Sequence, residues 1–334
     1  MVVDLKLLTS QSRLLFAISL QPAQGRRFQP TGFPSLGPAS YRTSAGMSVL
    51  VESAQSMANR LEATIWDVAQ NKPTADAEGV SHVVVMRAGK FLTDTLVESH
   101  RLNSPYVLGG KDKNKEFLET LKSALGGLAE GPIDRKKLAS ALLQYDIGSL
   151  LHGVFLAKKE LAGGRLRVAR ALTAFVEADE AEVVASGGVK NDHVNPSGVT
   201  KDGFGNVPFA RDEFTAQHLT LYVNIDLAQI RGYGLGTSVE ELLIVLALYK
   251  VRALVDGDMR FRTACDLVRK DSGPINATRP NGFVLPELAD LRAKLRDSID
   301  ASKKLMAVTE VSFDADLKKG GDDDDVADSD EAEG

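Results

Sequence analysis

Residues 218–227 read HLTLYVNIDL, and this stretch decides the fold class. Apolar and polar residues alternate along it, which is the period of a β-strand that buries one face. The apolar side chains are Leu219, Leu221, Val223, Ile225 and Leu227. The other face carries His218, Thr220, Tyr222 and Asn224. A half-polar sheet with one aromatic side chain can receive unstacked bases, although it can equally be solvated or covered by a helix.

A long, very apolar helix is predicted directly after this strand. Ser238 and Glu241 have the spacing of a capping box, and the helix runs to about Val255. The connecting segment Gly232–Gly236 (GYGLG) is compatible with a dinucleotide-binding loop. Its third glycine is misplaced for that motif, so the pattern favours a tight turn.

The remaining elements do not alternate strictly between strand and helix. Leu14–Leu20 reads as a strand buried on both faces, and Ser53 caps a helix whose apolar stripe contains Met57 and Leu61. Strands are predicted at Val49–Val51, Leu150–Ala157 and Ala171–Val176, a hairpin over His82–Met86 and Phe91–Val97, and helices over Asn114–Leu125, Asp134–Tyr145 and from Pro286 through Ile299. This order predicts an α+β fold.

Ser186–Asn206 is rich in Gly, Asn and Asp and shows no periodicity, so it reads as a long, functional or mobile loop. Its polar residues match neither a calcium nor a zinc motif. Within it, Lys201–Phe209 is similar to the RNP1 signature of RNA-recognition strands, but Pro208 is unfavourable in a central strand.

The charge is distributed unevenly. The 334 residues carry a formal net charge of −5 and are 43% hydrophobic, enough for a sizeable core. Residues 321–334 hold eight acids and no base, which leaves 40 basic against 37 acidic residues in the rest of the chain. We expect one domain over residues 1–313, with insertions at about 21–47, 82–145 and 186–213, and a disordered acidic tail over 314–334.

Cys265 is the only cysteine, and the longest strictly apolar run, Leu242–Tyr249, is too short to cross a bilayer. These features predict a cytoplasmic protein without a membrane partner. The sequence has no Walker loop, no GxSxG, no HExxH and no catalytic Cys-His pattern, so we expect no enzyme activity, cofactor or metal.

Two segments have the chemistry of RNA contacts. Arg26 and Arg27 stand beside aromatic residues, which suits phosphate and base contacts, although Phe28 can equally anchor a loop to the core. The second segment is the helix that follows Ser53, whose free N–H groups favour an anion. Its polar side chains are Gln55, Ser56, Asn59 and Arg60, which an ordinary solvated helix face would also explain.

Several segments together resemble one family, the guide-RNA-binding backbone subunit of type I-G CRISPR complexes (formerly I-U), in the RAMP superfamily. The matching stretches are Arg26–Tyr41, Val51–Glu62, Glu98–Tyr106, Tyr145–Ala157, Arg165–Ala178, Ser186–Asp192, Gly205–Ala216 and Leu246–Leu267. They lie in order over most of residues 13–270. The acidic tail and the region around 109–133 show no such resemblance.

The resemblance implies an RRM-like (ferredoxin-like) palm with large insertions, one of which forms a thumb, either His82–Val97 or, as we favour, Ser186–Phe209. Several copies of such a subunit coat one guide RNA (crRNA) in a head-to-tail helical array within the Cascade complex, beside its other subunits. The guide then reads target DNA by base pairing, while the protein grips the backbone and is not a nuclease.

The predicted RNA contacts follow from both the residue types and the resemblance. They are Arg26, Arg27, Gln55, Ser56, Asn59, Arg60, His100, Arg101, Lys190, Asn191, His193, Arg260 and Arg262. The alternative function is a RAMP-type endoribonuclease that uses His100 or His193 as its acid–base group, with Asp192 and Asp202 as loop aspartates. A nucleotide-binding enzyme built on Gly232–Gly236 is a third hypothesis.

Overall fold

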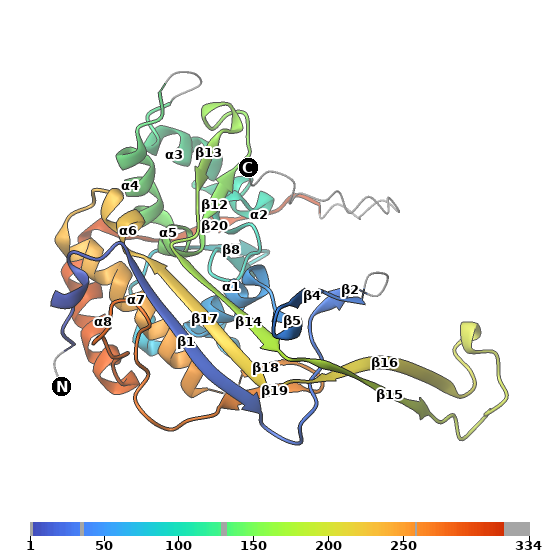
Figure 1. Cartoon of the computed structure of the whole chain (residues 1–334). Coiled ribbons are helices and arrows are strands. Elements are labelled where there is room, and N and C mark those ends of the chain that lie inside the picture. The colour runs from blue at the N-terminus through green and yellow to red at the C-terminus, as the bar shows by residue number, and fades with distance from the viewer. Residues whose placement is uncertain (1–2, 34–36, 128–131, 258, 317–334) are drawn as a thin grey trace.

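The centre of the molecule is a seven-stranded sheet in the order β18-β19-β1-β17-β14-β5-β4 (Figure 1). The structure is a computed structural model and describes residues 3–33, 37–127, 132–257 and 259–316. The sheet consists of β1 (Arg13–Pro22), β4 (Ser40–Thr43), β5 (Gly46–Glu52), β14 (Leu172–Asp179), β17 (His218–Asp226), β18 (Met259–Arg262) and β19 (Cys265–Arg269).

Four of these strands and two helices form an RRM-like core. Along the chain the order is β1, α1 (Ala54–Ala63), β14, β17, α7 (Thr237–Asp256) and β19. In space the strands lie in the order β19-β1-β17-β14, and every neighbouring pair is antiparallel. This is the ferredoxin-like βαββαβ arrangement. The predicted α+β, RRM-like fold is therefore confirmed.

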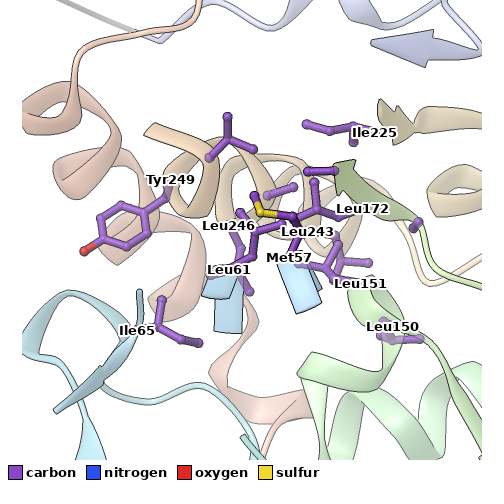
Figure 2. Close-up of a cluster of buried hydrophobic side chains, with 14 of the residues drawn as sticks. Met57, Leu61, Ile65, Leu150, Leu151, Leu172, Ile225, Leu243, Leu246 and Tyr249 are labelled. Carbon is purple, nitrogen blue, oxygen red and sulfur yellow. The ribbon is translucent and has the colours of Figure 1, made fainter. Parts of the chain in front are cut away.

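One face of this sheet is buried under α1 and α7. The register places Ile18, Leu221 and Val176 in one row across β1, β17 and β14, and all three side chains are buried. Met57 and Leu61 of α1 meet Leu243 and Leu246 of α7 beneath the sheet (Figure 2). Burying these apolar side chains stabilises the core.

Long segments are inserted between the core elements. The insertion between α1 and β14 and the C-terminal segment together form a second sheet, in the order β11-β10-β20-β8-β9. Its strands are β8 (His82–Arg87), β9 (Lys90–Asp94), β10 (Lys111–Asp112), β11 (Lys115–Glu116) and β20 (Val308–Ser312). The helices around it are α2 (Pro105–Leu108), α3 (Phe117–Ala124), α4 (Arg135–Tyr145) and α5 (Ile147–His152), while α6 (Leu227–Gly232) and α8 (Leu288–Ser302) pack on the core.

Small two-stranded sheets complete the described part of the chain. They are β2 (Gly32–Phe33) with β3 (Gly37–Pro38), β6 (Trp66–Asp67) with β7 (Lys72–Pro73), and β12 (Val154–Leu156) with β13 (Leu166–Val168). Among the described residues, no helix is long and apolar enough to cross a membrane.

A hairpin of β15 (Glu182–Lys190) and β16 (Val207–Thr215) projects from the body between β14 and β17 (Figure 1). It corresponds to the thumb that we favoured, whereas His82–Val97 is packed into the second sheet. The prediction of a loop over Ser186–Asn206 was wrong at its N-terminal end, because residues 186–190 belong to β15, and it ends correctly just before β16. The strands have no buried face along most of their length, so no period appears in the sequence.

Three other local predictions were wrong. β1 is buried on one face only, and the residues of its other face are half-buried or exposed. Leu150–Ala157 contains the end of α5 and the short β12 instead of one strand. The helix α7 begins one residue before Ser238, with Gly236 at its N-cap, and Glu241 pairs with Lys294 of α8 instead of closing a capping box. The predicted disordered tail falls from residue 317 onward outside the described residues.

Charged side chains are buried where the core meets the inserted helices. Arg101 donates from two guanidinium nitrogens to the carboxylate of Glu62, at 2.6 and 2.9 Å. Lys250 of α7 is fully buried, with Nζ 2.9 Å from Nε2 of His152. Burial lowers the pKa of His152 well below its usual range, so its neutral ring accepts a hydrogen bond from the ammonium group. These contacts join α1 and α7 to the helical subregion.

Asp146, at the junction of α4 and α5, gives a prediction about pH. Burial raises the pKa of this carboxyl group to about 6, although a hydrogen bond from Ser149 and the charge of Arg101 oppose the shift. The raised folded-state pKa means that stability from this group is present below the unfolded pKa and is lost as the pH rises through about 6. Asp146→Asn removes this loss. The free energy of unfolding of the variant minus that of the wild type should therefore be about 2 kcal/mol larger at about pH 7.5 than at about pH 4.5.

Urea unfolding at the two pH values measures this difference. Asp112→Asn, on the exposed strand β10, is the matched control and should leave the pH dependence of the wild type unchanged. Equal pH dependence in Asp146→Asn and the wild type would contradict the prediction.

Candidate functional site

A basic groove lies at the root of the β15–β16 hairpin. It has a volume of about 650 Å³, and the loop after β1 and the β18–β19 turn line it. Arg26, Arg27 and Arg260 reach into it from these two segments. All three arginines are exposed, so the groove presents guanidinium groups to solvent.

Phe28 fixes the position of the first two arginines. Its ring is fully buried against Phe214, with ring centroids 6.4 Å apart. The two residues also exchange backbone hydrogen bonds, each at 2.9 Å, which tie the loop to the end of β16. Phe28 is therefore an anchor, and the arginines next to it are left at the surface.

Two carboxylates also line the groove. Glu213 lies 3.5 Å from Arg27 and is hydrogen-bonded by Arg211 at 2.6 Å. Burial opposes ionisation of Glu213, but the hydrogen bond and charge of Arg211 and the charge of Arg27 lower its pKa. Asp266 lies 3.6 Å from Arg260, whose side chain is 71% exposed. Three arginines and two carboxylates thus line the groove, which leaves its lining with one net positive charge.

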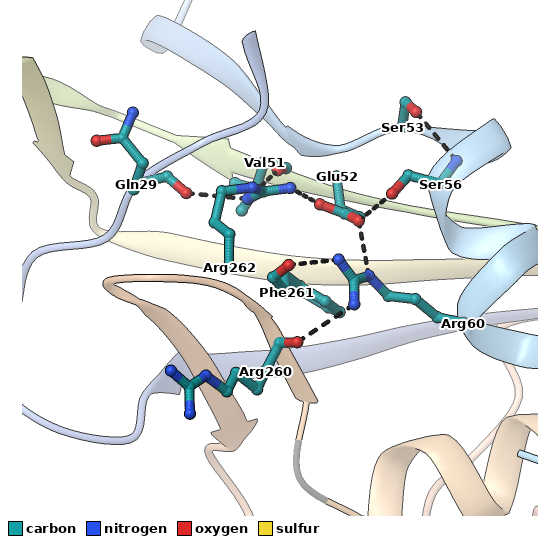
Figure 3. Close-up of polar contacts among 9 residues, drawn as sticks. All are labelled: Gln29, Val51, Glu52, Ser53, Ser56, Arg60, Arg260, Phe261 and Arg262. Carbon is teal, nitrogen blue, oxygen red and sulfur yellow. Dashed lines mark hydrogen bonds and ion pairs between the residues drawn. The ribbon is translucent and has the colours of Figure 1, made fainter. Parts of the chain in front are cut away.

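Behind the groove, a buried carboxylate joins three parts of the chain (Figure 3). Glu52, at the end of β5, has no exposed side-chain surface. It accepts hydrogen bonds from Ser56 and from Nε of Arg60, the latter at 2.7 Å, and it pairs with Arg262. Two guanidinium groups on one carboxylate leave this cluster with one net positive charge.

Arg60 and Arg262 hold the β18–β19 turn in place. Arg60 donates to the carbonyl oxygens of Arg260, at 3.2 Å, and Phe261, and its guanidinium lies 4.9 Å from the centroid of the Phe261 ring. Arg262 donates to the carbonyl oxygens of Gln29 and Val51, at 3.0 and 3.1 Å. Burial lowers the pKa of both arginines. These two predicted RNA contacts are thus committed to internal partners and position Arg260.

The remaining predicted residues on α1 divide into two kinds. Gln55 and Asn59 are exposed but do not line the groove, whereas Ser56 is occupied by Glu52. A smaller hollow is lined by Arg60. It shares Met259 and Arg260 with the groove, so it adjoins the groove. The helix N-terminus predicted as an anion site is capped by Ser53, whose hydroxyl accepts from the Ser56 N–H at 3.3 Å.

Arg101 does not belong to an exposed site. It is 8% exposed, and the hydrogen bonds to Glu62 occupy its guanidinium group. A side chain in this position cannot reach RNA at the surface, so we correct this prediction. His100, next to it, is exposed, but no contact places it beside the groove.

Lys190, Asn191 and His193 lie at the far end of the hairpin. Eight residues of β15 separate Lys190 from the root, which corresponds to roughly 25 Å. Asp192 organises the tip, because its carboxylate accepts from the N–H groups of Val194, Asn195 and Gly205, at 2.8 to 3.0 Å. The structure therefore separates these predicted residues from the groove.

The other motifs take structural places. Gly232–Gly236 connects α6 to α7, and Lys201–Phe209 lies at the hairpin tip and the start of β16, outside the central sheet. Tyr222 of β17 stacks on Phe175 of β14 with centroids 5.2 Å apart, and Glu177 and Asp179 lie on the same face as Phe175. Two acids make this face unfavourable for phosphate. In the described ranges, no three His, Cys, Asp or Glu side chains are grouped to hold a metal.

Comparison with known proteins identifies a relationship. The family of CRISPR-associated protein GSU0053 (Cas_GSU0053) matches residues 14–183, just over half of the chain. No curated protein sequence matches significantly. Among solved structures, a chain of a "CRISPR RNA-guided surveillance complex, pre-nicking" is 14% identical, covers 76% of this chain and 73% of its own, and has a TM-score of 0.40. Csc2 from Thermofilum pendens is 8% identical, with 91% and 80% covered and a TM-score of 0.34.

Proposed function

The chain belongs to the family of CRISPR-associated protein GSU0053, and on that premise we propose that it is a non-catalytic backbone subunit of a type I CRISPR surveillance complex that holds guide RNA. The observation that carries the proposal is the groove. There Arg26, Arg27 and Arg260 converge from segments more than 230 residues apart in the chain. Arginines suit this role because a guanidinium group forks onto phosphate.

The groove favours binding that does not depend on base identity. Its cationic groups are the guanidinium groups of three arginines, which contact phosphate and not the edges of bases. Sequence would then be read by the guide pairing with target DNA.

The projecting hairpin supports the proposed head-to-tail self-association. Val183, Val189 and Phe209 are each more than half exposed on it. Apolar side chains that project into water are stabilised when a partner covers them. A hairpin that reaches from one copy to a different surface of the next gives a heterologous, open array. Other subunits of the complex are expected partners at its ends.

The competing function is a RAMP-type endoribonuclease. His100 and His193 lie on different segments, and Asp192 is occupied by backbone N–H groups. This arrangement supports the scaffold over the nuclease, because acid–base catalysis needs a positioned pair at the scissile phosphate.

Incubation of the purified protein with an end-labelled guide precursor tests the proposal. We expect stoichiometric protection of the RNA from an added ribonuclease, in fragments whose lengths are multiples of one unit, and no cutting by the protein itself. Cleavage that is lost in His100→Ala or His193→Ala would favour the nuclease. RNA that the protein neither protects from the added ribonuclease nor cuts itself would contradict both functions.

A further inference from the structure

A second basic hollow, of about 730 Å³, lies between the start of α4, strand β13 and helix α6. Arg135, Arg165 and Arg167 line it. None of the described lining residues is an aspartate or a glutamate, whereas Glu213 and Asp266 line the groove at the hairpin root. The described lining of the second hollow is therefore more basic than that of the groove.

Local contacts hold two of these arginines in place. β12 and β13 pair Phe155 with Arg167, and the guanidinium of Arg167 lies 4.9 Å from the centroid of the Phe155 ring. Phe155 is 45% exposed, so this stack stands open to solvent. Nε of Arg165 donates to the carbonyl oxygen of Ala162 at 3.0 Å. Less side-chain freedom is lost on binding when the cations are already positioned.

The helix α4 adds to the positive field at this hollow. Arg135 is its first residue, and its N-terminal N–H groups carry partial positive charge. Asp134, which directly precedes Arg135, is engaged as the N-cap, because its carboxylate accepts from the Lys137 N–H at 2.9 Å. The cap thus uses that carboxylate within the helix.

The floor of the hollow is largely apolar. Leu138 is buried, Ile133 and Val168 are half-buried, and Tyr233 is buried. Burial raises the pKa of Tyr233 to about 12, so its phenol stays neutral. Its hydroxyl donates to the carbonyl oxygen of Leu150 at 2.7 Å and faces inward. A charged rim over an apolar floor suits a nucleotide, which offers a phosphate and a flat base together.

The two basic sites lie at opposite ends of the same strands. β14 runs from Leu172, three residues after Ala169 of the second hollow, to Asp179 at the hairpin root, and β17 runs back to α6 (Figure 1). Eight residues of extended strand span roughly 25 Å. This exceeds the Debye length of about 8 Å at physiological ionic strength, so the sites act as separate charge clusters.

We propose that Arg135, Arg165 and Arg167 form a second phosphodiester-binding site, which holds a single strand of nucleic acid beside the strand in the groove. This inference rests on the proposed function for the presence of nucleic acid. An acidic protein segment is the less favoured occupant, because it offers charge but no flat base for the Arg167–Phe155 stack and the apolar floor. The strand is either a further stretch of RNA or a DNA strand, which share this chemistry.

The test uses the full chain, first saturated with unlabelled guide-length RNA. A labelled thymidine oligonucleotide and a labelled uridine oligonucleotide, neither of which pairs with the guide, are then titrated in separate arms by fluorescence anisotropy. Arg135→Gln/Arg167→Gln is the test variant. Lys111→Gln/Lys115→Gln, which changes two exposed cations of the second sheet, is the control with the same charge change. Thermal unfolding verifies that both variants fold.

The test variant should bind the probe about tenfold or more weakly. Its slope of log K against log salt should fall by roughly 1.4, at about 0.7 for each lost contact to a single strand. The affinity for guide RNA should remain within about twofold of the wild type, because the two substituted arginines contact the second strand and not the guide in the groove. Preference for the thymidine or the uridine probe identifies DNA or RNA as the source.

Three results would overturn the inference: no probe binding by the loaded wild type, equal probe affinity in the test and control variants, or tighter binding of a polyglutamate peptide than of either probe. Failure of the proposed function gives a different result. In that case the wild type binds no guide RNA. Probe binding by the same two variants is then measured without guide RNA, and a tenfold loss of probe affinity in the test variant alone still supports the second site.

Discussion

Glu52→Ala is expected to destabilise the folded protein by about 3–5 kcal/mol, which is the cost of leaving buried charges without their partner. The carboxylate is fully buried and pairs with Arg60 and Arg262, so its removal leaves two guanidinium groups near each other. The same change frees the β18–β19 turn from α1 and β5. Urea unfolding at constant pH measures the loss, and RNA affinity should fall with it because Arg260 is no longer held.

The matched control is Asp266→Ala. This carboxylate also lies near an arginine of β18, at 3.6 Å, but both side chains are largely exposed. An exposed pair contributes only about 0–1 kcal/mol. A second variant, Glu52→Leu/Arg60→Met/Arg262→Met, removes every charge of the cluster and should lose less stability than Glu52→Ala. Equal losses for Glu52→Ala and Asp266→Ala would show that burial of the cluster does not matter.

The sequence was sufficient for the elements whose signal is local. The alternation in β17 and the stripe of Met57 and Leu61 in α1 each report one buried face, and the structure confirms both. The β15 strand gave no such signal, because its Gly-rich residues lie in solvent on both faces. Glu241 had the spacing of a capping residue, but a partner on α8, more than 50 residues away, binds it instead.

In the candidate site, too, the sequence indicates features that depend on neighbouring residues but not contacts between residues far apart in the chain. Arg26 and Arg27 could be selected from their place beside an aromatic anchor, and the structure leaves them exposed. Arg60 and Arg262 have the same residue type but serve the interior, because Glu52 faces both of them. That carboxylate is the last residue of β5 and is fully buried. Its pairing with Arg262 crosses 210 residues, and composition cannot reveal it.

Arg26→Ala/Arg27→Ala/Arg260→Ala should weaken guide-RNA binding by roughly 100-fold to 1,000-fold, since each lost charge-assisted contact costs roughly tenfold. The three side chains lie on exposed segments whose backbones are anchored by Phe28 and Arg60, so the fold should be retained. The slope of log K against log salt should fall by about 2, because three contacts to a single strand contribute roughly 0.7 each. Filter binding over a range of salt concentrations measures both quantities.

Net charge is the competing explanation for such a loss, and the matched control removes it. Lys111→Ala/Lys113→Ala/Lys115→Ala deletes three exposed cations from the second sheet, away from the groove, and changes the net charge by the same amount. If the groove holds the RNA, this control keeps nearly the affinity and salt slope of the wild type, because its lysines contact no phosphate. If both triple variants lose affinity equally, the RNA is attracted by the overall charge of the protein, and the groove is not its binding site.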